Sequence, residues 1–219
     1  MARLLFEKRG NAVWISHLDL MRLFQRAFKR AGLNLKHTQG FNPRPSVSIA
    51  LPLSVGVESG CELLDFELEG EIPSCDEIPE RLNRALISGV RVLAAYEEGR
   101  KIRDLSLLRC KVMLEYDGGV TEEAAECLRA LFRRDQLIVE KKGKNGPSQQ
   151  DLIPMIRSME ISLADGNTVC MEALICCQNP SLNPTLLCTA VDTYLPELAP
   201  DYSRCERVEI YDANESVFR

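Results

Sequence analysis

The chain has 219 residues, of which 45% are hydrophobic and 27% charged, and its formal net charge is −5. This composition excludes a disordered tail, a collagen-like fibre and a coiled-coil rod, and the length suffices for one large domain or two small ones. Charge appears as early as Arg3 and no run of about 18 uncharged apolar residues exists, so we expect no signal peptide, no membrane span and a cytoplasmic location.

The first half of the chain predicts the element order β-α-β-β-α-β. A strand is expected over 4–15, bent near Gly10, followed by a helix that opens at Ser16, because Asp19 completes a capping box, and that ends at Gly32. Apolar periodicity then predicts strands over 46–51, 63–69 and 90–96 and a helix over 73–88.

The second half repeats this order. Strands are expected over 108–116, 137–142, 155–163, 168–177 and 205–211, and helices over 121–134 and 183–195. Together the halves predict an α+β fold of two tandem ferredoxin-like (β-α-β-β-α-β) units: an N-terminal domain over 1–99, which carries a basic helix, and a C-terminal domain over 108–219.

Nine cysteines raise the question of disulfides or metal sites. Their number is odd, no pair has the C-x-x-C spacing of a zinc or iron–sulfur site, and most lie among apolar residues. We therefore expect reduced structural cysteines, no metal site and no iron–sulfur cluster on this chain.

Charge is distributed unevenly along the chain. Residues 1–50 contain nine Lys and Arg against two Asp and Glu, whereas residues 51–100 and 151–219 are strongly acidic. Helical spacing places Arg22, Arg26, Lys29 and Arg30 on one exposed face, with no acid expected among them. This face predicts a nucleic-acid contact; the alternative is solvated charge that is balanced in three dimensions.

A turn-rich segment, Gln39–Pro45, follows the basic helix. Phe41 offers a stacking surface, whereas Gln39, Asn42 and Arg44 offer hydrogen-bond donors, a set that suits a phosphate backbone and an unstacked base. The alternative is a structural loop in which Phe41 fills the core. The lysine-rich segment 141–144 (KKGK) could extend the positive surface.

The two histidines, His17 and His37, are the candidates for acid–base catalysis. His17 lies at the expected helix start, where the helix dipole disfavours its charged form. The alternative is that it packs or donates a hydrogen bond there. No phosphate-binding glycine loop and no hydrolase nucleophile motif is present.

Four stretches carry a resemblance to a known family: 16–22 (SHLDLMR), 39–45 (QGFNPRP), 50–53 (ALPL) and 56–59 (GVES). The chain resembles the radical-SAM-linked protein family, a domain of unknown function. The resemblance implies association, because members are encoded beside, or fused to, a B12-binding radical SAM protein. Iron–sulfur, SAM and cobalamin are then expected on the partner and no cofactor on this chain.

Three functions follow from these observations. The first is a non-catalytic accessory protein that binds RNA through the basic helix and the 39–45 loop and works with the radical SAM enzyme in RNA modification or processing. The second is an RNA-processing enzyme that uses His17 or His37. The third is an adaptor that binds only the partner protein.

Overall fold

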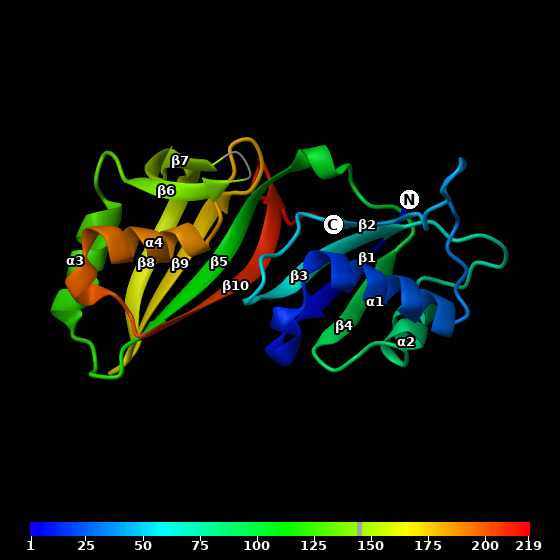
Figure 1. The fold of residues 1–219 in the computed structure, drawn as a ribbon, viewed down its shortest axis with the longest axis horizontal. Coiled ribbons are helices and arrows are strands. Elements are labelled where there is room, and N and C mark those ends of the chain that lie inside the picture. The colour runs from blue at the N-terminus through cyan, green and yellow to red at the C-terminus, as the bar shows by residue number, and fades with distance from the viewer. Residues whose placement is uncertain (144–145) are drawn as a thin grey trace. The chain divides into compact units, whose positions relative to one another are not determined.

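The structure, a computed structural model, describes residues 1–143 and 146–219. The chain divides into two compact units (Figure 1). Unit 1 comprises Met1–Asp104 together with Phe218–Arg219, and unit 2 comprises Leu105–Val217.

Unit 1 is a four-stranded antiparallel sheet with the strand order β4-β1-β3-β2. Its two helices lie on the same side of the sheet (Figure 1). In chain order the elements are β1 (Ala2–Lys8), α1 (His17–Arg30), β2 (Val47–Ala50), β3 (Val57–Phe66), α2 (Glu77–Asn83) and β4 (Val90–Tyr96).

The core of unit 1 forms where α1 packs on the sheet. Phe24 and Phe28 of α1 are fully buried, and their rings lie 4.7 Å and 5.1 Å from those of Phe6 and Phe66. Met21 is only partly buried and packs at the edge of this core. These contacts fix which face of α1 points outward.

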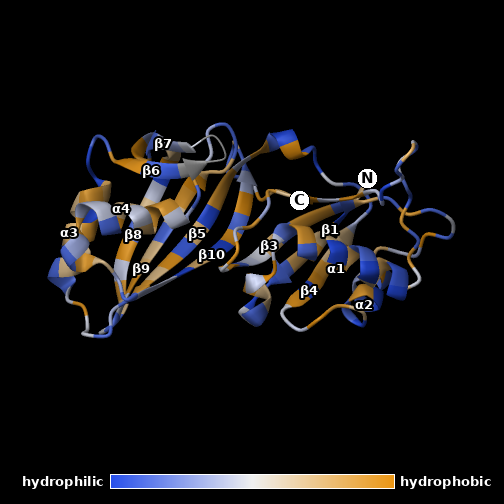
Figure 2. Ribbon diagram, viewed as in Figure 1, coloured by the Kyte–Doolittle hydropathy of each residue, from blue (hydrophilic) through white to orange (hydrophobic). Residues whose placement is uncertain are grey.

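The four main strands of unit 2 are also antiparallel and follow the same order, β10-β5-β9-β8. Between its first helix and its second strand it carries an additional two-stranded hairpin, β6–β7. Its elements are β5 (Leu105–Glu115), α3 (Glu122–Phe132), β6 (Ile138–Gly143), β7 (Gly146–Asp151), β8 (Ile156–Asp165), β9 (Thr168–Cys176), α4 (Thr185–Tyr194) and β10 (Tyr202–Asp212). Along the strands of both units apolar and polar residues alternate (Figure 2).

The expected α+β class is confirmed, with four α-helices in the described part of the chain. Several element boundaries differ from expectation, and two of these differences have a visible cause. The first strand ends at Lys8, because Gly10 (φ 55°) begins a 3-10 turn that buries Val13. Helix α2 ends early, because the Asn83 amide pairs with both backbone groups of Val92 in β4. Strand β7 was not predicted at all.

None of the described residues belongs to a helix long and apolar enough to cross a bilayer.

Candidate nucleic-acid interface

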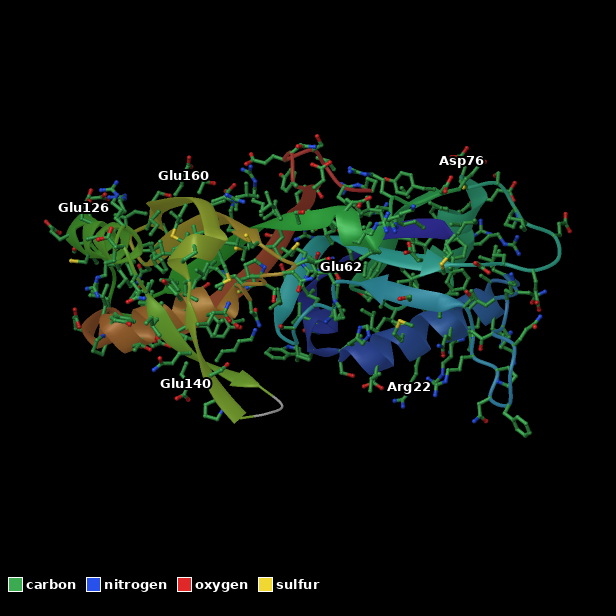
Figure 3. All side chains as sticks on the ribbon, turned by 90° about the horizontal axis from the view of Figure 1, so that it is seen from above. Arg22, Glu62, Asp76, Glu126, Glu140 and Glu160 are labelled. Atoms are coloured by element: carbon green, nitrogen blue, oxygen red, sulfur yellow. The ribbon has the colours of Figure 1, made fainter. Side chains whose placement is uncertain are left out.

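The basic face of α1, formed by Arg22, Arg26, Lys29 and Arg30, is exposed. At about 100° of rotation per residue the four positions fall within a 100° arc, opposite the buried Phe24 and Phe28. Figure 3 shows Arg22 projecting from α1 away from the sheet, and Figure 2 colours the visible face of the helix largely hydrophilic. The helix therefore presents four cations to solvent.

The expectation that no acid lies among these cations is wrong. Asp19 lies one turn before Arg22, and its carboxylate accepts from the Arg22 guanidinium at 2.9 Å. A hydrogen bond from the Ser16 hydroxyl (2.7 Å) and the bond from Arg22 hold the pKa of Asp19 below its ordinary value. The basic face is therefore partly neutralised at its N-terminal end.

The C-terminal end of the same face has a different electrostatic environment. Lys29 and Arg30 lie in the last turn of α1, where cations interact favourably with the helix dipole. One Arg30 nitrogen reaches the Ala85 carbonyl at 3.4 Å. Within residues 1–143 and 146–219 neither Arg26 nor Lys29 forms an ion pair. These two side chains are the most available for a phosphate.

The buried Lys8 fixes where α1 begins. Its Nζ donates to the carbonyls of Val13 (3.1 Å) and Ile15 (2.9 Å), immediately before the Ser16 cap. Burial lowers the pKa of Lys8, whereas the nearby Glu62 carboxylate opposes that shift. Sequence reasoning missed this contact, because a lysine at a strand end is ordinarily solvated.

The 39–45 loop is held at its base and open at its tip. The backbone N–H of Thr38 donates to Arg44 O (2.8 Å), and Arg44 N–H donates to the Thr38 hydroxyl (3.0 Å). Two residues further out on each side, Ser46 N–H donates to Lys36 O (2.7 Å). These bonds close the stem, so the tip projects without secondary structure of its own.

The tip presents the residues expected to contact nucleic acid. Gln39, Phe41, Asn42 and Arg44 are all exposed, and Phe41 is fully so, at 104%. The alternative in which Phe41 fills the core is therefore wrong. An aromatic ring held out from a stem that is closed by hydrogen bonds is available to stack on a ligand.

The two histidines do not form one site. His17 is the first residue of α1 and is half-buried, on the side of the helix turned from the basic face. His37 lies beside Lys29, with which it lines a common pocket. Twelve residues of helix separate His17 from Lys29, about 18 Å at 1.5 Å per residue. The two imidazoles therefore do not lie where both could act on the same bond of a substrate.

Two depressions flank the basic face. One, of about 410 Å³, lies along Arg22 and Arg26 and is bounded by Ile87. The other, of about 300 Å³, lies between Lys29 and the segment that leads into the loop; we name it the Lys29 pocket. Glu69, which lies three residues after the end of β3, also lines this pocket. No pattern in the sequence connects Glu69 with Lys29.

The remaining predicted features lie outside this interface. In unit 2, Lys141 belongs to β6 and is partly buried, whereas Lys144 lies outside the described residues. The described residues contain all nine cysteines, and none of them is in a disulfide. No group of three or more His, Cys, Asp or Glu suited to a metal ion occurs within residues 1–143 and 146–219.

Comparison with protein families gives one match. The family described as "Uncharacterized protein conserved in bacteria (DUF2344)" matches residues 2–184. No curated protein matches the chain.

Comparison with solved structures relates the fold to larger proteins. A chain in the crystal structure of a Cbf5-Nop10-Gar1 complex is similar over 95% of this chain and 48% of its own length, with a TM-score of 0.52 and 8% identity. A chain in the archaeal box H/ACA sRNP Nop10-Cbf5 complex is similar over 94% and 46%, with a TM-score of 0.47 and 11% identity. This chain therefore spans about half the length of the chains it matches. At 8% identity the likeness to the chain of the Cbf5-Nop10-Gar1 complex is one of fold alone.

Proposed function

The chain belongs to the DUF2344 family of bacterial proteins, and we propose that it is an accessory RNA-binding protein that works with a B12-binding radical SAM enzyme in RNA modification or processing. The observation that carries RNA binding is the fully exposed Phe41, at the tip of a loop whose flanking residues His37 and Pro45 line a pocket together with Lys29 of the basic face. Cations that follow a strand's phosphates, together with an aromatic ring on which a base stacks, are the recurring components of single-strand recognition.

The composition of this surface favours RNA over a protein partner. The four cations of α1 are rich in donors for phosphate oxygens, and Arg44 and Asn42 add further donors around Phe41. A protein docking surface would instead be expected to surround its aromatic anchor with apolar side chains. Here all six residues of Gln39–Arg44 are exposed, and the side chains next to Phe41 that can contact a ligand, those of Gln39, Asn42 and Arg44, are polar.

The partnership with a radical SAM enzyme rests on the resemblance carried by two stretches of unit 1. Residues 16–22 form the cap and first turns of α1, and residues 39–45 form the exposed loop. We propose that both stretches contribute to one interface, the first through Arg22 and the second through Phe41. In this proposal the partner binds the iron–sulfur cluster, SAM and cobalamin, and this chain binds the RNA.

We also propose that each unit is ferredoxin-like. The support is the element order β-α-β-β-α-β combined with the strand orders β4-β1-β3-β2 and β10-β5-β9-β8, in which the first and third strands of each unit lie at the centre. The hairpin β6–β7 is then an insertion into the second unit.

Co-purification of the tagged full chain from its own host tests the function. Both a B12-binding radical SAM protein and RNA are expected in the eluate, and the Phe41→Ala variant should retain the protein while losing RNA. If the partner elutes without RNA from the wild-type chain, the protein is an adaptor. If RNA elutes without the partner, the proposed partnership is wrong.

A further inference from the structure

The Lys29 pocket is a small depression that combines apolar surface with several polar side chains. Its volume is about 300 Å³, at the small end of ligand sites. Leu33 and Leu35, which are 2% and 7% exposed, contribute apolar surface, whereas Lys29, Asn34, His37 and Glu69 contribute polar groups. Apolar surface combined with a few convergent polar groups is the arrangement that small-molecule sites share.

Backbone hydrogen bonds fix the chain segments that line this pocket. Gly32 (φ 67°) ends α1, and Leu33 N–H donates back to Phe28 O at 2.9 Å, which turns the chain beneath Lys29. The next residues are fixed from the other side, because Glu69 N–H donates to Asn34 O and Lys36 N–H donates to Glu67 O, each at 2.9 Å. A preformed site loses little conformational entropy on binding.

Lys29 belongs both to the pocket and to the basic face of α1, so a strand that follows the cations passes the pocket mouth. We propose that the Lys29 pocket takes one unstacked base of the bound strand and prefers a base with an exocyclic amino group, such as cytosine, over uracil. This inference rests on the proposed RNA-binding function and assigns its substrate class: single-stranded RNA, since a base within a duplex cannot enter.

The chemistry of the polar groups gives the preference. A carboxylate such as that of Glu69 only accepts hydrogen bonds, and an ammonium group such as that of Lys29 only donates them. The edge of cytosine offers an amino donor beside ring acceptors, which matches this acceptor and donor. Uracil offers one N–H between two carbonyl oxygens, and a carboxylate repels those oxygens. Glu69 is therefore the residue that discriminates.

Binding of oligocytidine and oligouridine of about eight nucleotides tests the preference, since site sizes for single strands run from about 4 to 16 nucleotides. The wild-type chain should bind oligocytidine about tenfold more tightly. Glu69→Gln should reduce this ratio to about twofold or less, because glutamine both donates and accepts. Glu71→Gln is the matched control: Glu71 is exposed, lies two residues away and does not line the pocket, so its ratio should stay at the wild-type value.

The outcomes separate this inference from the function on which it rests. If the wild-type chain binds both oligonucleotides equally, and binding weakens with salt as expected, the base pocket is wrong and RNA binding stands. If the chain binds neither, RNA binding is wrong, and cytidine 5′-monophosphate then tests the pocket by NMR. Unchanged amide signals of Leu33, Asn34 and Glu69 at saturating nucleotide would overturn it.

Discussion

Units 1 and 2 share an element order and a strand order, yet their first helices carry opposite charge. Helix α1 of unit 1 carries four cations and one acidic residue, Asp19. Helix α3 of unit 2 carries one cation, Arg129, and three acidic residues, Glu122, Glu123 and Glu126. The Arg129 guanidinium donates to the carboxylates of Glu122 (2.7 Å) and Glu126 (2.6 Å). The same supporting architecture therefore carries two unlike surfaces, and function has to be assigned from the surface.

The segment between the first helix and the second strand shows the same contrast. In unit 1 it is the open 39–45 loop, with Phe41 at its tip. In unit 2 it contains the hairpin β6–β7, which is tied down: Leu137 N–H donates to the Asp151 carboxylate (2.9 Å) and the Tyr194 hydroxyl donates to Ile138 O (2.8 Å). Loops on a rigid scaffold commonly carry function. The loop of unit 1 carries an exposed aromatic ring, whereas the segment of unit 2 over residues 133–155 contains no aromatic residue.

Core truncations should give the largest effects and should be alike in the two units. Phe24→Ala removes a fully buried ring of unit 1 and should lower the free energy of unfolding by about 3–5 kcal/mol. Leu128→Ala in unit 2, also fully buried, should cost about 2–5 kcal/mol. Urea denaturation measures both, and a loss below about 1 kcal/mol for Phe24→Ala would mean that the faces of α1 are assigned wrongly.

Removal of the loop aromatic should affect RNA and not stability. Phe41→Ala should weaken single-stranded RNA binding by about 1–3 kcal/mol, because it removes one base-stacking surface. Its free energy of unfolding should stay within about 0.5 kcal/mol of wild type, since the ring is fully exposed. Tyr202→Ala in unit 2 is the matched control, as Tyr202 is 52% exposed and should leave RNA affinity unchanged. Equal losses in the two variants would contradict the assignment of the site to unit 1.

The helix caps should distinguish the units more finely. The Ser16 hydroxyl accepts from Asp19 N–H, so Ser16→Ala should destabilise the protein by about 0.5–2 kcal/mol. Thr121 stands at the same position of α3 and makes no side-chain cap bond. Thr121→Ala should therefore cost less than Ser16→Ala in thermal denaturation, and the reverse order would contradict the capping geometry.

Acid should weaken the cap of α1. The pKa of Asp19 is lowered in the folded protein, first by the Ser16 hydroxyl and then by Arg22. The carboxylate thus stabilises the fold above the ordinary Asp pKa of 3.8, and this contribution is lost as the pH falls through the lowered value. The stability difference between wild type and Asp19→Asn should shrink below that pH; a difference that is constant with pH would show that the carboxylate charge plays no part.

Local signals in the sequence predicted most of the fold. Ser16 and Asp19 marked the start of α1 and Gly32 its end, because capping depends on a few neighbouring residues. Strand β7 (GPSQQD) escaped prediction, because it has no apolar alternation and is a strand only through its pairing with β6.

The candidate site was predicted only in part. The spacing of Arg22, Arg26 and Lys29 marked an exposed basic face, but the neutralising role of Asp19 and the exposure of Phe41 depended on the fold. The Lys29 pocket could not be predicted, because Glu69 reaches it through the pairing of Leu35 with Leu68. Contacts over such sequence distances leave no periodic signal.

The central claim is that RNA binds to the basic face of α1, and the salt dependence of affinity tests it most directly. If four phosphates are neutralised on a single strand, the plot of log affinity against log salt should have a slope of about −3. Arg26→Ala with Lys29→Ala should reduce this slope by about 1.4. Arg133→Ala with Arg157→Ala, which removes two exposed cations from unit 2, should leave it unchanged. If the first pair binds RNA as wild type does at every salt concentration, the basic face of α1 is not the site.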